Sequence, residues 1–179
     1  MPLTTHRLIY FAGLMLLLIS SFAWLPAVGS APKVDEGAAR DVVLGGLLAY
    51  SEESDSQPWV VFASGPQIVL DRIGVDRSPY FKIPALPRLR LEGDWHQVSN
   101  SASQVDAGFV QTSGTSLLFG EITDERIAHV EIEGVSGRFD VGAPGFIISG
   151  LAPGEGALSL RWLSAGGQLL LESQASRVD

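Results

Sequence analysis

The 179-residue sequence contains no cysteine, and it has few lysines and histidines. Without cysteine the chain has no disulfide, no thiol nucleophile, no cysteine-held metal cluster and no lipid-modified cysteine. Two lysines, Lys33 and Lys82, stand against ten arginines, and the formal net charge is −8. This acidic balance argues against nucleic acid and against anionic lipid head groups, because both require a basic surface. We therefore expect no nucleic-acid partner.

Recognisable catalytic motifs are also missing. The sequence has no G-x-S-x-G nucleophile elbow, no H-E-x-x-H zinc motif, no P-loop and no G-x-G-x-x-G after a strand. Glu131 and Glu133 are expected on one face of a strand, whereas a glycosidase needs carboxylates that face each other across a cleft. We predict a chain that is not an enzyme, with no catalytic residue, no metal and no cofactor. A hydrolase that uses His96 or His129 beside a carboxylate is the less favoured alternative.

One long apolar run is present, Leu8–Leu25, with eighteen residues and no charge. As a helix it would measure about 27 Å, close to the ~30 Å hydrocarbon thickness of a bilayer. A single arginine precedes the run and acidic residues follow it, which favours an internal N-terminus and an extracytoplasmic domain. The length of the run and Trp24 at its outer end favour a retained anchor. Ala27 and Gly29 fit cleavage before Ser30, so a secreted form is the alternative.

The remaining chain is apolar enough to bury a core. We divide the sequence into a signal anchor or signal peptide at 1–29, a spacer at 30–35, and two folded parts at 36–104 and 105–175. The most loop-like stretch of the domain is Ser99–Gln104, which is the predicted seam between the two parts.

The first part begins with a predicted helix over Glu36–Tyr50, capped by Asp35. Its apolar residues recur at three- and four-residue spacing, which places them on one face: Ala39, Val42, Val43, Leu47 and Tyr50. Strands are expected at Trp59–Phe62, Gln67–Ile73 and Arg88–Leu91. Three prolines between 79 and 87 indicate an edge or a crossing loop before the last of these strands.

The second part carries the strongest β signal, because short runs rich in branched and aromatic residues are separated by glycines. The expected strands are Gly108–Gln111, Ser116–Phe119, Ile127–Glu133, Gly137–Val141, Phe146–Ser149, Ala157–Leu163 and Gln168–Glu172. Such spacing is typical of an antiparallel sandwich or barrel. The predicted fold class is mainly β (α+β), with one short helix and antiparallel sheets, sandwich-like in the C-terminal half.

Three aromatic residues are candidates for a ligand site. Tyr80 and Phe81 lie in the proline-rich segment, where exposed apolar surface would suit binding. Trp95 follows a Gly-Asp turn, and we expect it to fill the core. A small-ligand or glycan site would instead be concave, aromatic-lined and include one or more of the three.

Two short segments resemble known elements. Phe119–Ile132 (FGEITDERIAHVEI) is similar to an element of small, uncharacterised, membrane-anchored extracytoplasmic proteins of Gram-positive bacteria. Ser149–Leu160 (SGLAPGEGALSL) resembles a corner of immunoglobulin-like sandwiches. The resemblance implies a bacterial envelope protein and assigns no residue a role. We predict a non-catalytic interaction or accessory module, tethered to the membrane, with a possible envelope protein partner. A small-ligand or glycan-binding surface domain is the alternative.

Overall fold

The computed structural model describes residues 34–51, 57–76, 88–93, 95–112, 116–152 and 156–178. The chain divides into two compact units, 1–33 with 75–88 and 34–74 with 89–179. The second unit holds all the described residues except Val75, Asp76 and Arg88. The apolar run Leu8–Leu25 lies outside the described residues, as do Tyr80 and Phe81. Within the described ranges, no helix has the length and apolar character needed to cross a membrane.

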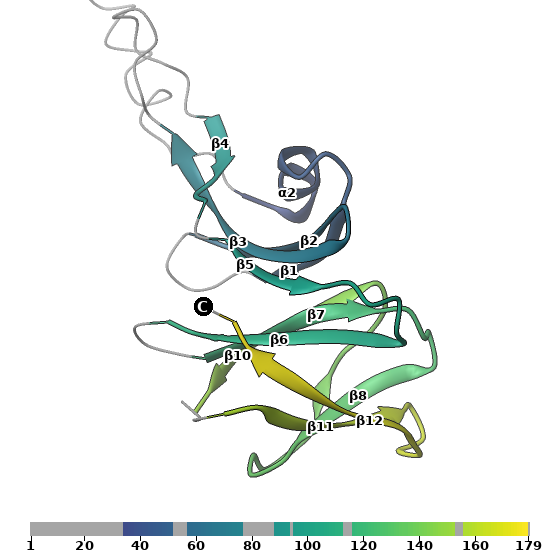
Figure 1. The fold of residues 1–179 in the computed structure, drawn as a ribbon. Coiled ribbons are helices and arrows are strands. Elements are labelled where there is room, and N and C mark those ends of the chain that lie inside the picture. The colour runs from purple at the N-terminus through teal and green to yellow at the C-terminus, as the bar shows by residue number, and fades with distance from the viewer. Residues whose placement is uncertain are drawn as a thin grey trace, which may run out of the picture. The chain divides into compact units, whose positions relative to one another are not determined.

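The first half of the second unit is a short helix on a five-stranded sheet (Figure 1). Its elements are α2 (Glu36–Val42), β1 (Leu47–Ser51), β2 (Trp59–Ser64), β3 (Gln67–Asp76), β4 (Arg88–Leu91) and β5 (His96–Ser99). The strand order is β1-β2-β3-β4, and β5 also pairs with β3. The three strands expected here are confirmed, whereas β1 and β5 were not predicted.

The predicted helix over Glu36–Tyr50 is correct only in its first half. Asp35 caps α2 as expected, since its Oδ1 accepts a hydrogen bond from the N–H of Ala38 at 2.8 Å. The helix ends at Val42 because Leu44 and Gly45 follow with φ of 54° and 87°, in the left-handed region. The chain then turns into β1, so the apolar residues beyond the turn belong to a strand.

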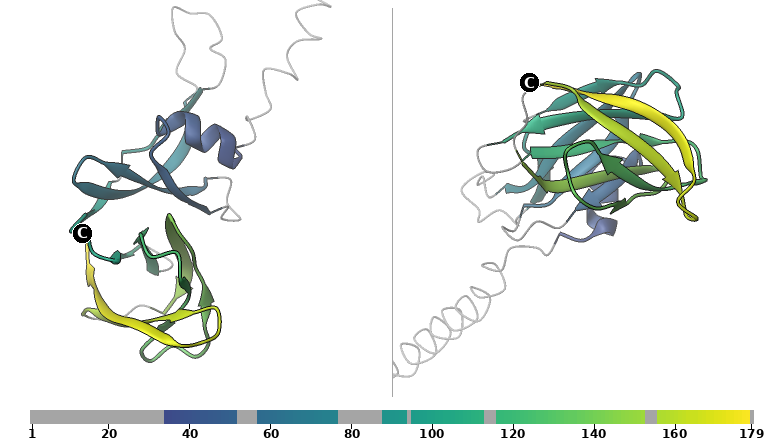
Figure 2. Two further views of the ribbon diagram at one scale, coloured as in Figure 1. Left: turned by 90° about the vertical axis from the view of Figure 1, so that its right-hand side faces the viewer. Right: turned by 90° about the horizontal axis from the view of Figure 1, so that it is seen from below.

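The second half is one seven-stranded sheet, rolled into a nearly closed barrel (Figure 2). Its strands are β6 (Val105–Gln111), β7 (Ser116–Ile122), β8 (Ile127–Ile132), β9 (Phe139–Asp140), β10 (Gly145–Leu151), β11 (Leu158–Ser164) and β12 (Leu169–Arg177). They follow the order β10-β7-β6-β12-β11-β8-β9.

The mainly β class and the antiparallel first sheet are therefore confirmed, and the C-terminal half is barrel-like and not a sandwich, with one parallel pair of strands. Strand β12 extends beyond the predicted end at Glu172 and reaches β6. There Ser176 and Arg177 pair in parallel with Gly108 and Phe109, and this pairing joins β10-β7-β6 to β12-β11-β8-β9 in one mixed sheet. The connection between the two sheets covers 100–104, within the predicted seam.

Three groups of buried side chains hold the elements together. The barrel interior is filled around Trp162, whose ring meets Phe146 edge to face at a centroid distance of 5.3 Å. Between α2 and the first sheet, Ala39 and Val43 pack on β2 and β3. A third group joins the two sheets: Trp59, Val61, Ile68, Leu70, Val110, Leu117 and Phe119. Burial of these apolar faces is the main stabilising contribution.

Trp95 does not fill the core, contrary to the sequence-based expectation. It precedes β5 and is 54% exposed, while Val98 of β5 packs against the group between the sheets. The preceding connection is fixed by Asp71, a fully buried carboxylate on β3. The carboxylate accepts the N–H of Gly93 at 3.1 Å, and Gly93 has a φ of 90° that favours glycine.

Candidate functional site

A depression of about 880 Å³ lies on the outer face of the barrel sheet, over β8, β11 and β12. Alternation along the strands positions its side chains, because successive residues point to opposite faces. On β8, Glu131 lies between the buried Val130 and Ile132, and on β11 the exposed Arg161 lies beside the buried Trp162. The lining comes from Glu131, Ile132, Glu133, Val135, Gly137, Arg138, Ser159, Leu160, Arg161, Glu172, Ser173 and Gln174.

Strand register arranges the outward-facing residues in two rows. In the first row, Arg161 is paired with Glu131 on one side and with Glu172 on the other. In the second row, Ser159 is paired with Gln174, and its carbonyl accepts the N–H of Glu133 at 3.0 Å. Paired strands therefore supply most of the site, and the segment between β8 and β9 supplies Glu133, Val135, Gly137 and Arg138.

The first row, together with Arg138 just before β9, forms a line of alternating charges that we term the charge ladder (Arg138, Glu131, Arg161, Glu172). Arg138 Nε donates to Glu131 Oε1 at 2.8 Å. Arg161 Nη1 donates to Glu131 Oε2 at 3.0 Å, and Arg161 Nε lies 3.5 Å from Glu172 Oε1. Each member thus faces an opposite charge on its neighbour.

The charge ladder contributes little to the stability of the fold. Its arginine side chains are about half exposed and that of Glu172 is 66% exposed, while Glu131 is the most buried at 27%. Exposed pairs of this kind contribute about 0–1 kcal/mol each, since water and salt screen them. Glu133 adds a further carboxylate to the lining, and this side chain has no hydrogen bond or ion pair with the residues that the structure describes. The charged lining residues then carry a formal net charge of −1.

The two histidines that a hydrolase would use lie outside the depression. His129 Nδ1 is 2.9 Å from Asp140 Oδ1, on the outer face of β8 and β9. The carboxylate of Asp140 is 94% exposed, so this pair sits on open surface and not in a cleft. His96 is half-buried on β5, and its Nδ1 has no partner among the described residues. Those residues also include no group of three potential metal ligands.

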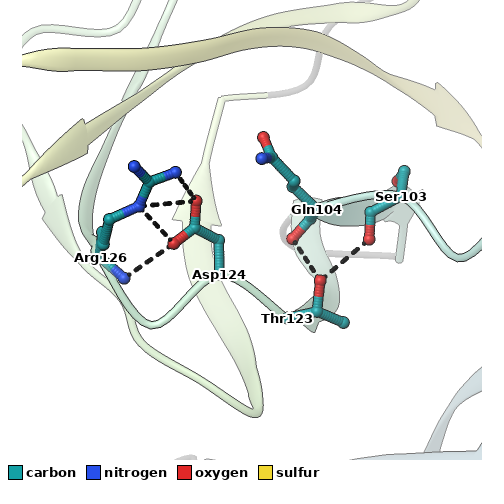
Figure 3. Close-up of polar contacts among 5 residues, drawn as sticks. All are labelled: Ser103, Gln104, Thr123, Asp124 and Arg126. Carbon is teal, nitrogen blue, oxygen red and sulfur yellow. Dashed lines mark hydrogen bonds and ion pairs between the residues drawn. The ribbon is translucent and has the colours of Figure 1, made fainter.

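A second polar cluster surrounds the turn between β7 and β8 (Figure 3). Thr123 Oγ1 donates to the carbonyl of Ser103 at 3.0 Å and lies 3.3 Å from that of Gln104, which joins this turn to the start of β6. Asp124 accepts from Arg126 Nε and Nη2 at 2.9 and 2.7 Å, and from the Arg126 N–H at 3.0 Å. The side-chain bonds from Arg126, followed by its backbone N–H, lower the pKa of Asp124 to about 2.

This lowered pKa predicts an acid-dependent effect of Asp124→Asn. A carboxylate whose pKa is lower in the folded protein than in the unfolded chain stabilises the fold above its unfolded pKa of about 3.9. That stabilisation is lost as the pH falls toward 2. Asparagine can still accept the N–H of Arg126, so the variant isolates the charge. We expect it to be less stable than the wild type at pH 7, and we expect the difference to shrink as the pH falls from about 5 toward 2, by denaturant titration of the full chain in a mild detergent.

Glu125→Gln provides the matched control, since it removes a neighbouring charge and leaves the Asp124–Arg126 pair intact. Its stability difference from the wild type should not follow the same pH window. A constant difference between the Asn variant and the wild type from pH 6 to pH 2 would contradict the assignment.

Sequence reasoning identified part of this site. Glu131 on β8 and Glu133, which lies in the turn after β8 ends at Ile132, both line the depression. Trp95 does not line it, and Tyr80 and Phe81 lie outside the described residues. The missed residues are Arg138, Arg161 and Glu172. Alternation marks Arg161 as outward-facing, but the sequence does not reveal which strands are neighbours.

Comparison of the chain with protein-family models, with curated proteins and with solved structures gives no match. The resemblance of Phe119–Ile132 to anchored envelope proteins therefore stays a prediction. In the fold, this element covers the end of β7, the following turn and β8.

Proposed function

We propose that the chain is a non-catalytic interaction module held at the outer surface of a bacterial cell membrane by Leu8–Leu25. The depression over β8, β11 and β12 is its contact surface. The observation that carries this proposal is the charge ladder on a rigid outer face. Charged side chains that the fold does not require, arranged in fixed register around a concavity, suit recognition of a polar partner.

The chemistry of the depression favours binding over catalysis. Each oxygen of Glu131 already accepts a hydrogen bond from a guanidinium, so this carboxylate is not placed to take a proton from a substrate. The nearest histidine–carboxylate pair lies elsewhere, at His129 and Asp140. A hydrolase therefore has less support than an interaction module.

A small-ligand or glycan-binding domain is the second candidate. It is favoured by Trp95, which is 54% exposed and offers a surface on which a sugar ring could stack. Among the described residues that line the depression, however, none is aromatic. A partner in the cell envelope that presents polar groups is the better fit to the depression.

The proposal is tested in intact cells with a photocrosslinking residue at position 174. Gln174 lines the depression, while the exposed Gln97 on β5 lies outside it and provides the control position. We expect the full-length chain in the membrane fraction, its domain open to external protease. We also expect an adduct from position 174 that is absent from position 97.

Three results would count against the proposal. A mature chain that starts at Ser30 in the medium would exclude the tether and favour a secreted binder. Equal adducts from both positions, or none from position 174, would exclude the depression as the contact surface.

A further inference from the structure

We propose that the depression recognises a zwitterionic group, meaning one ammonium and one carboxylate a few ångströms apart. This inference rests on the proposed binding role and names the chemistry of the ligand. Such a group can belong to a free amino acid or short peptide, or to neighbouring charged side chains of a protein segment.

The charge ladder is electrically balanced, because its two arginines and two glutamates sum to zero, and the −1 charge of the whole lining comes from Glu133. The ladder by itself therefore favours neither a lone anion nor a lone cation. A single ion would pair with one member of a ladder pair and leave the other member to water. A ligand with both charges can instead satisfy both members of one pair.

The three contacts of the charge ladder differ in length and exposure. Glu131 is held by hydrogen bonds of 2.8 and 3.0 Å, one on each oxygen. The contact between Arg161 and Glu172 is longer, 3.5 Å, and Glu172 is 66% exposed. This pair is the one that a ligand can enter, with its carboxylate on Arg161 and its ammonium on Glu172. The alternation of charge would then continue through the ligand.

Hydrogen-bonding groups lie next to the Arg161–Glu172 pair. The adjacent row supplies Ser159 and Gln174, which donate and accept hydrogen bonds, and the carboxylate of Glu133. These groups suit the amide of a dipeptide or the main chain of an extended segment. A depression of about 880 Å³ falls within the range of small-ligand sites, about 300–1,000 Å³.

The test uses three forms of one dipeptide, titrated into the full chain in detergent micelles and followed by NMR shifts. Alanyl-alanine is the zwitterion, its N-acetyl form keeps only the carboxylate, and its amide keeps only the ammonium. We expect the zwitterion to bind at least about tenfold more tightly than either single-charge form. Equal binding of the three forms, or tighter binding of a single-charge form, would overturn the inference.

Variants assign the two charges to residues. Arg161→Gln and Glu172→Gln should each reduce binding of the zwitterion to the level of the single-charge forms. Arg126→Gln is the matched control, because Arg126 is an exposed arginine with its own carboxylate partner and does not line the depression. Its affinity for the dipeptide should equal that of the wild type. If both depression variants retain wild-type affinity with unchanged unfolding midpoints, the inference is wrong.

A fourth probe separates the two sources of the group. The blocked peptide acetyl-Lys-Ala-Glu-amide presents an ammonium and a carboxylate only on its side chains. Tighter binding of this blocked peptide than of alanyl-alanine would assign a protein segment as the ligand. Tighter binding of alanyl-alanine would assign a free amino acid or short peptide. If neither probe binds, the inference fails. A crosslink from position 174 in cells would then leave the interaction module standing with a different ligand.

Discussion

Replacing Trp162 by alanine should lower the free energy of unfolding by about 3–5 kcal/mol, the range for a buried tryptophan reduced to alanine. Trp162 is fully buried and stands between Val130 on β8 and Leu171 on β12, which are its register partners. Its ring contacts Phe146 from β10, near the open end of the sheet order. The indole of β11 is thus packed in the barrel interior among residues of β8, β10 and β12. Denaturant titration of the full chain in a mild detergent measures the change.

Trp162→Phe is the matched control for this variant. It keeps an aromatic ring beside Phe146 and removes the Nε1–H that donates to Ser173 Oγ at 2.8 Å. We expect a smaller loss of about 1–2 kcal/mol, from one hydrogen bond and some volume. If the alanine variant lost less than about 1 kcal/mol, the barrel could not be packed around this side chain.

The sequence predicted which face of a strand a residue occupies better than it predicted which strands pair with each other. Alternation was enough to place Glu131 on one face of its strand, because it depends only on residues close in the chain. The charge ladder depends on register between β8 and β11, which places Arg161 opposite Glu131 across 30 residues of sequence. No local pattern encodes such a pairing, so three of the four ladder members could not be associated with the site.

The joining of β6 to β12, which makes one seven-stranded sheet, was missed for the same reason. The parallel contact of Ser176 with Gly108 joins strands far apart in sequence, and it involves only two residue pairs. The helix prediction failed beyond Val42 for a different reason, because the local sequence does contain a signal that ends the helix. Gly45 and Gly46 are poor helix residues, and the apolar spacing that continues to Tyr50 serves a strand equally well.

Gly120 on β7 is a position where packing, and not backbone freedom, requires glycine. A Cβ at this site would overlap the carbonyl oxygen of Asp106 on the neighbouring β6. It would also lie 3.1 Å from the Cα of Ala107 and 3.0 Å from Cε1 of Phe146. The first two obstacles are backbone atoms of a paired strand, so they cannot move aside as a flexible side chain would. We expect Gly120→Ala to cost about 3 kcal/mol, at the upper end of the usual range for overpacking.

Gly142→Ala tests this reasoning with the same added methyl group. Gly142 precedes β10 and has no atom within 4 Å of the corresponding Cβ position, so the change in stability should stay within about 0.5 kcal/mol. If Gly120→Ala were as stable as Gly142→Ala, β6 and β7 could not be paired as closely as Ala107 opposite Gly120 requires. If the Gly120 variant cannot be purified folded under conditions that yield folded Gly142→Ala, the contrast between the two variants gives the same answer.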